Sequence, residues 1–147
     1  MKKIFVILPL ILSFIFCCTK TPEEPSSYVL HLKYIGEKSS FTETAGKLFL
    51  SGNLPGDIEI GSFSSLIINL ITLERFQIQF TMNLNGNVIK LQGIADINTE
   101  TGSISGHGTI IGGTNRYDNA TGNYTEQAQM LSQTTVSGFL TLTINER

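Results

Sequence analysis

Cysteine and histidine, which often serve as nucleophiles, proton donors or metal ligands, are scarce in this sequence. The 147 residues include 2 cysteines and 2 histidines. His31 alternates with Lys33, and His107 alternates with Ser105. Alternation with polar residues along a strand predicts side chains that face solvent. The sequence therefore predicts no nucleophile triad, no metal site and no cofactor.

One carboxylate is an exception, because its position matches the apolar side of a strand pattern. Glu74 shares parity with Phe76, Ile78, Phe80 and Met82. If the strand extends back that far, Glu74 lies near the opening of an apolar interior and is a weak catalytic candidate. The alternative is that "LER" forms a turn and Glu74 is solvated. Glycoside hydrolysis and aspartic proteolysis need two convergent carboxylates, so the sequence favours a function without catalysis.

The first twenty residues, "MKKIFVILPLILSFIFCCTK", have the pattern of an export signal. Two lysines precede an uncharged run that extends over residues 4–16. A membrane-spanning helix needs roughly 20 apolar residues, and Pro9 would kink such a helix. We therefore expect residues 1–17 to be a signal peptide that is removed during export.

The two cysteines of the chain end this signal. Bacterial lipoprotein signals end at a cysteine that receives lipid and that follows a small residue. Cys18 follows the small Cys17, whereas Cys17 follows the bulky Phe16, so we expect lipidation at Cys18. The alternatives are an ordinary cleaved signal that leaves a free thiol, and a short transmembrane anchor. A lipid at Cys18 predicts a bacterial envelope protein that is attached to the outer membrane or the cell surface.

The remaining chain divides into a tether and one domain. The stretch "TKTPEEPSS" is short, polar and interrupted by proline, so we assign residues 18–27 to a lipid-anchored tether. Residues 28–147 form a single domain. The chain has a formal net charge of −2 and no basic run. We therefore do not expect nucleic acid to be a partner.

Alternating polar and apolar residues predict β-strands along most of this domain. The segments "YVLHLKYI", "RFQIQFTMNL", "VIKLQGIADI" and "TVSGFLTLTI" each alternate, and Asn85-Gly86 marks a tight hairpin between two of them. Shorter strands are expected at "KLFLSG" and "DIEIG". The run "SSLIINLITLE" fits a buried strand or a short helix, and its β-branched residues favour a strand.

This strand content predicts an all-β fold, either a sandwich or a barrel. A barrel has no open edges, which matters in an exported domain that no disulfide stabilises. We therefore predict a closed antiparallel β-barrel of about eight strands. A transmembrane barrel is disfavoured, because the sequence shows no regular aromatic girdles.

The stretch "GHGTIIGGTNRYDNATGNYT", residues 106–125, is rich in glycine. Neither nucleotide-binding pattern fits, because Thr114 and Asn115 stand where a phosphate-binding loop needs lysine and a hydroxyl residue. Ile111 stands where the dinucleotide pattern needs its third glycine. A structural role is therefore expected.

This stretch resembles the "GGTGxFxxAxG" signature of the allene oxide cyclase and dirigent barrel superfamily. The matching residues are Gly112, Gly113, Thr114, Tyr117, Ala120 and Gly122. Asn115 replaces the usual third glycine and tolerates a left-handed backbone conformation. The resemblance covers roughly residues 93–145. It implies a barrel and leaves a homo-oligomer open, since the plant members form dimers and trimers.

The resemblance also gives the glycine stretch a structural interpretation. Gly112 and Gly113 would end a strand and permit a sharp turn, with a positive φ at Gly113. Tyr117 and Ala120 would fold back and cover one end of the barrel. No catalytic residue can be carried over from the family, because its reactive positions lie on strands that cannot be matched here.

Three functions remain. In the favoured one, the barrel of an envelope protein binds an apolar small molecule or a protein partner. The alternatives are a cyclase-like enzyme and a structural or adhesive domain with a solid interior. The candidate ligand-binding residues are Tyr28, Phe76, Phe80 and Met82. Small residues in the later strands, including Gly93, Gly106, Gly108 and Gly138, predict unfilled space on their side of the interior.

Overall fold

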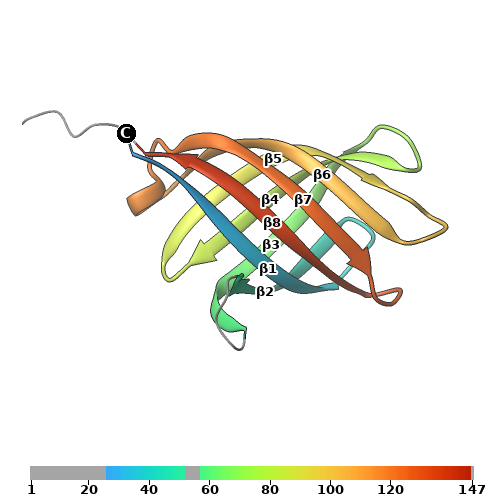
Figure 1. Cartoon of the computed structure of the whole chain (residues 1–147). Helices are drawn as coiled ribbons and strands as arrows, with labels where there is room; N and C mark the ends of the chain where they lie inside the picture. Colours follow the sequence, from blue (N-terminus) through green and yellow to red (C-terminus); the bar gives the residue numbers. More distant parts are fainter. Residues whose placement is uncertain (1–25, 52–56, 147) are drawn as a thin grey trace, which may run out of the picture.

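The computed structural model, which describes residues 26–51 and 57–146, is a closed antiparallel barrel (Figure 1). Each strand pairs with its neighbour in sequence, and β1 pairs with β8 to close the barrel. The strands are β1 (Ser27–Lys38), β2 (Glu43–Leu50), β3 (Ile58–Leu70), β4 (Arg75–Leu84), β5 (Asn87–Ile97), β6 (Ser103–Gly113), β7 (Thr121–Met130) and β8 (Thr135–Asn145). The predicted all-β barrel of about eight strands is confirmed.

The alternating sequence patterns form the barrel wall. In β4, the apolar side chains from Phe76 to Leu84 point inward and are buried, while Gln77, Gln79 and Thr81 are less buried. The predicted hairpin follows at Asn85 and Gly86, whose φ angles are 51° and 86°. Both values suit a tight two-residue turn.

The ambiguous run "SSLIINLITLE" lies mostly in β3, so the predicted strand is confirmed. The segment "DIEIG", which the sequence suggested as a separate strand, is part of the same 13-residue strand. The register of β3 against β4 shifts between Ile67 and Asn69. The chain then turns over residues 71–74, where the Ile71 N–H donates to the Arg75 carbonyl at 2.9 Å.

The two ends of the barrel differ in construction (Figure 1). The end that we call the open end carries four short loops, at residues 39–42, 71–74, 98–102 and 131–134. The opposite end, which we call the closed end, carries the start of β1, the end of β8 and the short 3₁₀ helix η1 (Asn115–Tyr117).

The glycine-rich stretch forms part of the closed end. β6 ends at Gly113, and the Thr114 N–H donates to the Val88 carbonyl at 2.8 Å. A positive φ occurs at Gly112, at 127°, and at Asn115, at 53°. The predicted positive φ at Gly113 is wrong. Gly113 is needed for space instead, because a Cβ there would lie 2.2 Å from the Val88 carbonyl oxygen.

The residues after this turn cover the barrel interior. Tyr117 and Ala120 are buried among the core side chains. The next glycine of the stretch, Gly122, has a φ of 143°, and a Cβ there would lie 1.9 Å from the Thr143 carbonyl oxygen. The stretch therefore closes one end of the barrel through close backbone contacts.

Candidate functional site

A cavity of about 200 Å³ occupies the open half of the barrel. Its lining includes Phe41 and Leu73, which lie in loops of the open end. The strands contribute apolar lining residues, which include Phe63, Ile67, Phe76, Ile78, Ile104 and Val136. Seven of the 19 described residues that line the cavity carry a polar side chain, and one of these is a carboxylate, Glu126.

Glu126 is buried inside the barrel, with 3% of its surface exposed. It lies on β7, which directs every second side chain inward. The Tyr34 hydroxyl on β1 donates a hydrogen bond to Glu126 Oε1. The other carboxylate oxygen, Oε2, has no hydrogen-bond partner, and neither has the hydroxyl of Tyr124 on the same strand. Buried polar atoms usually have partners, so the unpaired Oε2 of Glu126, a residue that lines the cavity, indicates a place for a ligand's polar group.

Burial controls the protonation of this carboxyl. Loss of solvation disfavours the charged form and raises the pKa of Glu126 to about 7, although the hydrogen bond from Tyr34 opposes the rise. Burial also raises the pKa of the Tyr34 and Tyr124 hydroxyls, and the nearby Glu126 charge adds to this effect. Glu126 therefore exchanges its proton near neutral pH, while both tyrosines remain protonated.

Inward-facing glycines make room for this polar group. A Cβ at Gly106 would lie 2.7 Å from Glu126 Oε2, and a Cβ at Gly138 would lie 2.8 Å from Tyr34 Cε1. A Cβ at Gly93 would lie 2.6 Å from the Tyr124 hydroxyl oxygen. The prediction that these glycines leave unfilled space is wrong, because side chains from neighbouring strands occupy that space.

Aromatic rings surround the carboxyl. The Tyr34 and Phe63 ring centroids are 5.0 Å apart, and those of Phe80 and Tyr124 are 6.0 Å apart. Tyr34 also packs edge-to-face on Phe80 with a centroid distance of 6.5 Å. Such contacts hold the rings in fixed orientations. Three of these four residues, Tyr34, Phe63 and Phe80, line the cavity.

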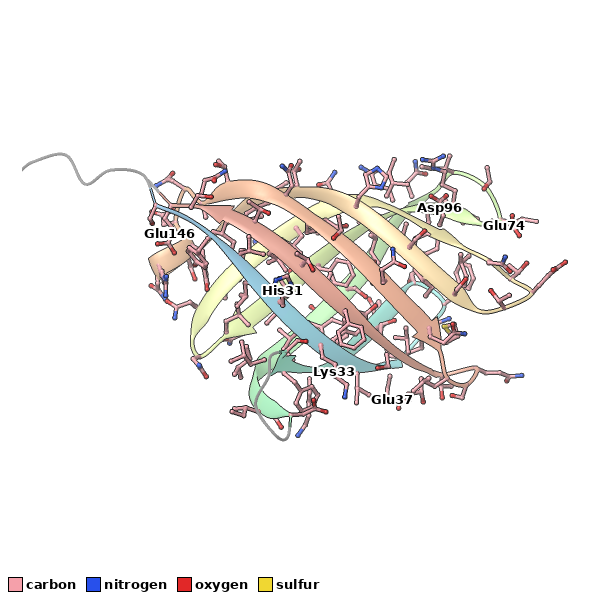
Figure 2. The ribbon with its side chains drawn as sticks, in the orientation of Figure 1. His31, Lys33, Glu37, Glu74, Asp96 and Glu146 are labelled. Atoms are coloured by element: carbon pink, nitrogen blue, oxygen red, sulfur yellow. The ribbon has the colours of Figure 1, made fainter. Side chains whose placement is uncertain are left out.

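Glu74, the catalytic candidate from the sequence, does not enter the cavity. It is exposed at the end of the loop before β4, and Figure 2 shows it at the open end, opposite Glu146. Its Oε1 accepts a hydrogen bond of 3.1 Å from Thr99, which lines the cavity. Glu74 therefore lies on the outer rim, in the solvated turn that the sequence left as the alternative.

The candidate ligand-binding residues are distributed over both halves of the barrel. Phe76 and Phe80 line the cavity. Met82 is buried deeper in the core and does not line it. Tyr28 is half-buried at the closed end, where its hydroxyl donates to Glu146 at 2.8 Å. The structure therefore brings two of the four to the cavity.

Sequence reasoning missed Glu126, although a signal was present. In "NYTEQAQM", Glu126 shares parity with Tyr124, Ala128 and Met130, all of which face inward or are partly buried. The same parity test that selected Glu74 selects Glu126 when it is applied to this strand. The predicted outward orientation of His31 and His107 is correct, since both are exposed.

Within residues 26–51 and 57–146, no group of three or more histidine, cysteine, aspartate or glutamate side chains is placed to hold a metal ion. In the same ranges, no helix has the length and apolarity that a membrane crossing requires.

Known structures share this architecture. The pterocarpan synthase dirigent protein GePTS1 superposes with a TM-score of 0.58 and 14% identity, over 86% of this chain and 88% of that chain. The chain has the dirigent barrel fold. A second dirigent barrel, the pterocarpan synthase PsPTS1, gives a TM-score of 0.56 and 13% identity over 82% and 96% of the two chains. The resemblance noted in the glycine-rich stretch is thus confirmed as a shared fold. No protein-family model and no curated protein sequence matches the chain.

Proposed function

We propose that this protein is an exported, lipid-anchored envelope protein whose dirigent-type barrel binds an apolar small molecule. The observation that carries the proposal is the apolar cavity, whose wall holds the buried carboxyl of Glu126 with one oxygen that lacks a hydrogen-bond partner. Apolar pockets with a few convergent polar groups are typical of small-molecule sites. The shared fold adds support, since an eight-stranded barrel can hold one small ligand.

The cavity argues against a purely structural role. Removing apolar side chains from a core costs stability, so a barrel that serves only as a scaffold gains from a filled interior. Phe41 and Leu73 also remain largely exposed at the cavity opening, at 73% and 88%. Binding of an apolar ligand would cover part of both side chains.

The binding proposal can be tested with Nile red, a neutral dye that fluoresces in apolar surroundings. Wild-type protein is expected to bind the dye at one site. Ser65 is buried and lines the cavity, so Ser65→Phe fills the space and is expected to abolish binding. The adjacent Ser64 is exposed, and Ser64→Phe is the matched control that should retain binding. Equal binding by the two variants would contradict the proposal.

The lipid anchor is a separate part of the proposal, because Cys17 and Cys18 lie outside the described residues. Cells grown with a clickable fatty acid should label the wild type, and Cys18→Ser should lose the label. Retained label in that variant would place the lipid at Cys17. Absence of label from the wild type would contradict lipidation.

A second candidate function is a cyclase-like reaction on the bound molecule. The observation that favours it is Glu126, an acid with a pKa of about 7 in the cavity wall. Such a group can donate or accept a proton at neutral pH. Mass spectrometry of ligands that copurify with the wild type and with Glu126→Gln separates the two functions. The same molecule on both proteins indicates binding alone, whereas a precursor that accumulates on the variant indicates conversion.

A further inference from the structure

The carboxyl of Glu126 lies among uncharged groups in the barrel interior. Glu126 Oε2 lacks a hydrogen-bond partner, and it lies next to Gly106, where an added Cβ would come within 2.7 Å of it. The groups that face the carboxyl are the Tyr34 hydroxyl on β1 and the Tyr124 hydroxyl on β7. Phe80 on β4 packs against both tyrosines, and Gly106 on β6 and Leu140 on β8 lie beside Glu126. None of these three residues carries a charge.

A positive charge to balance Glu126 is missing from the deep part of the cavity. Among the described residues that line the cavity, Lys38 is the one basic side chain. Lys38 is the last residue of β1, beside the open end, whereas Glu126 pairs with Leu140 in the middle of β8. The deep wall therefore presents an unbalanced acidic group.

We propose that the cavity selects apolar molecules whose polar end is a primary amine, bound with the ammonium against Glu126 and the apolar part toward the open end. This rests on the proposed function, because it assigns the ligand class for the same cavity. An ammonium supplies both a positive charge and N–H donors for Oε2. The surrounding rings add to the attraction, because aromatic faces favour cations in desolvated sites.

Other polar ends fit less well. Above about pH 7, where Glu126 is ionised, a carboxylate or phosphate end would place a second negative charge beside it in a poorly solvated site, which is costly. An alcohol can donate one hydrogen bond to Oε2 but leaves the carboxylate charge unbalanced. The site therefore ranks an amine above an alcohol and an alcohol above a carboxylate.

Amine binding also has a proton signature. In the free protein below about pH 7, burial keeps Glu126 protonated and neutral. When an ammonium binds, the carboxyl ionises to form the ion pair, and its proton leaves to solvent. Near pH 6, close to one proton should be released per amine bound, and little should be released at pH 8.5. An alcohol releases none at either pH.

The experiment is calorimetric titration with octylamine, 1-octanol and octanoate, which share the same apolar chain. At pH 8.5, where Glu126 is ionised, we expect octylamine to bind at least tenfold more tightly than 1-octanol, and octanoate to bind most weakly. Titrations at pH 6 in buffers with different ionisation enthalpies measure the released proton. The release should be present for octylamine and absent for 1-octanol.

Two variants test whether Glu126 causes the amine preference and the proton release. Glu126→Gln keeps the shape and an acceptor for Tyr34, and it should remove both the amine preference and the proton release. Glu74→Gln removes an exposed carboxylate at the rim and should retain both. If Glu126→Gln does not fold, proton release from wild-type protein still decides the matter, because no variant is needed to measure it.

The outcomes separate this inference from the proposed function. Equal affinity for octylamine and 1-octanol, or tighter binding of octanoate, would overturn the amine preference and leave apolar binding intact. Amine binding without proton release at pH 6 would also overturn it. If none of the three compounds binds and Nile red does not bind, the proposed function fails together with this inference.

Discussion

The closed and open ends of the barrel use apolar residues in opposite ways. At the closed end, Tyr117 and Ala120 are buried, and glycines let the backbone segments approach closely. At the open end, Phe41, Leu73 and Leu131 are exposed on short loops, and a cavity lies beneath this end. The closed end therefore buries its apolar residues inside the barrel, whereas the open end exposes apolar side chains to solvent.

This difference indicates where stability and function reside. The closed end is further joined by an ion pair of 2.7 Å between Arg116 and Glu146, and the Arg116 guanidinium lies 5.1 Å from the centre of the Tyr28 ring. Changes at the closed end should therefore alter stability with little effect on ligand binding. Changes at the open end should do the reverse.

The largest expected effect is at Gly113. Gly113→Val should lower the free energy of unfolding by about 3 kcal/mol, because its Cβ would overlap the Val88 carbonyl oxygen and Tyr117. Chemical denaturation measures the loss. Gly112→Ala is the control: its Cβ meets nothing within 4 Å, so only the strain of its φ of 127° remains, about 1 kcal/mol. Equal losses would show that backbone conformation, and not close packing, closes this end.

The second prediction concerns the pH dependence of stability. The folded state raises the pKa of Glu126 from 4.5 to about 7, so the native protein holds a proton that the unfolded chain releases. The free energy of unfolding should therefore fall as pH rises from about 4.5 to about 7, by up to about 3 kcal/mol. Glu126→Gln should lack this contribution. The difference between the two proteins in urea denaturation across this pH range measures it, and a constant difference would contradict the buried acid.

The third prediction tests the open end. Leu73→Ser should change the free energy of unfolding by less than about 0.5 kcal/mol, because the side chain is 88% exposed. The same change should weaken Nile red binding about fivefold, because Leu73 lines the cavity opening. Phe139→Ser is the control, since Phe139 is also exposed but lies outside the cavity on β8. A similar loss of Nile red affinity in both variants would contradict a binding site at the open end.

The smallest expected effect is at Arg116. Arg116→Ala should lower the free energy of unfolding by less than about 1 kcal/mol, because the Arg116 side chain in the ion pair with Glu146 is 57% exposed to solvent. Nile red affinity should not change, because the residue lies at the closed end. A weaker dye affinity in thermally stable Arg116→Ala protein would show that the two ends are coupled.

Local patterns in the sequence predicted most of the fold. Alternation in "RFQIQFTMNL" and the Asn85-Gly86 turn are determined by neighbouring residues, so the sequence shows them directly. The site depended on contacts between strands. Gly106 and Gly138 look like empty positions in the sequence, but Glu126 and Tyr34 from adjacent strands fill them. The register that brings these residues together is a property of the closed barrel, and no single strand reveals it.

The most direct test of a ligand site in the open half is a nuclear magnetic resonance experiment on protein with labelled isoleucine methyl groups. Ile78 and Ile104 line the cavity, whereas Ile89 and Ile144 are buried outside its lining. With 1-octanol bound, we predict intermolecular contacts to the methyl groups of Ile78 and Ile104 and none to those of Ile89 and Ile144. Contacts to Ile89 or Ile144, or only to the exposed Ile35 and Ile111, would contradict the account.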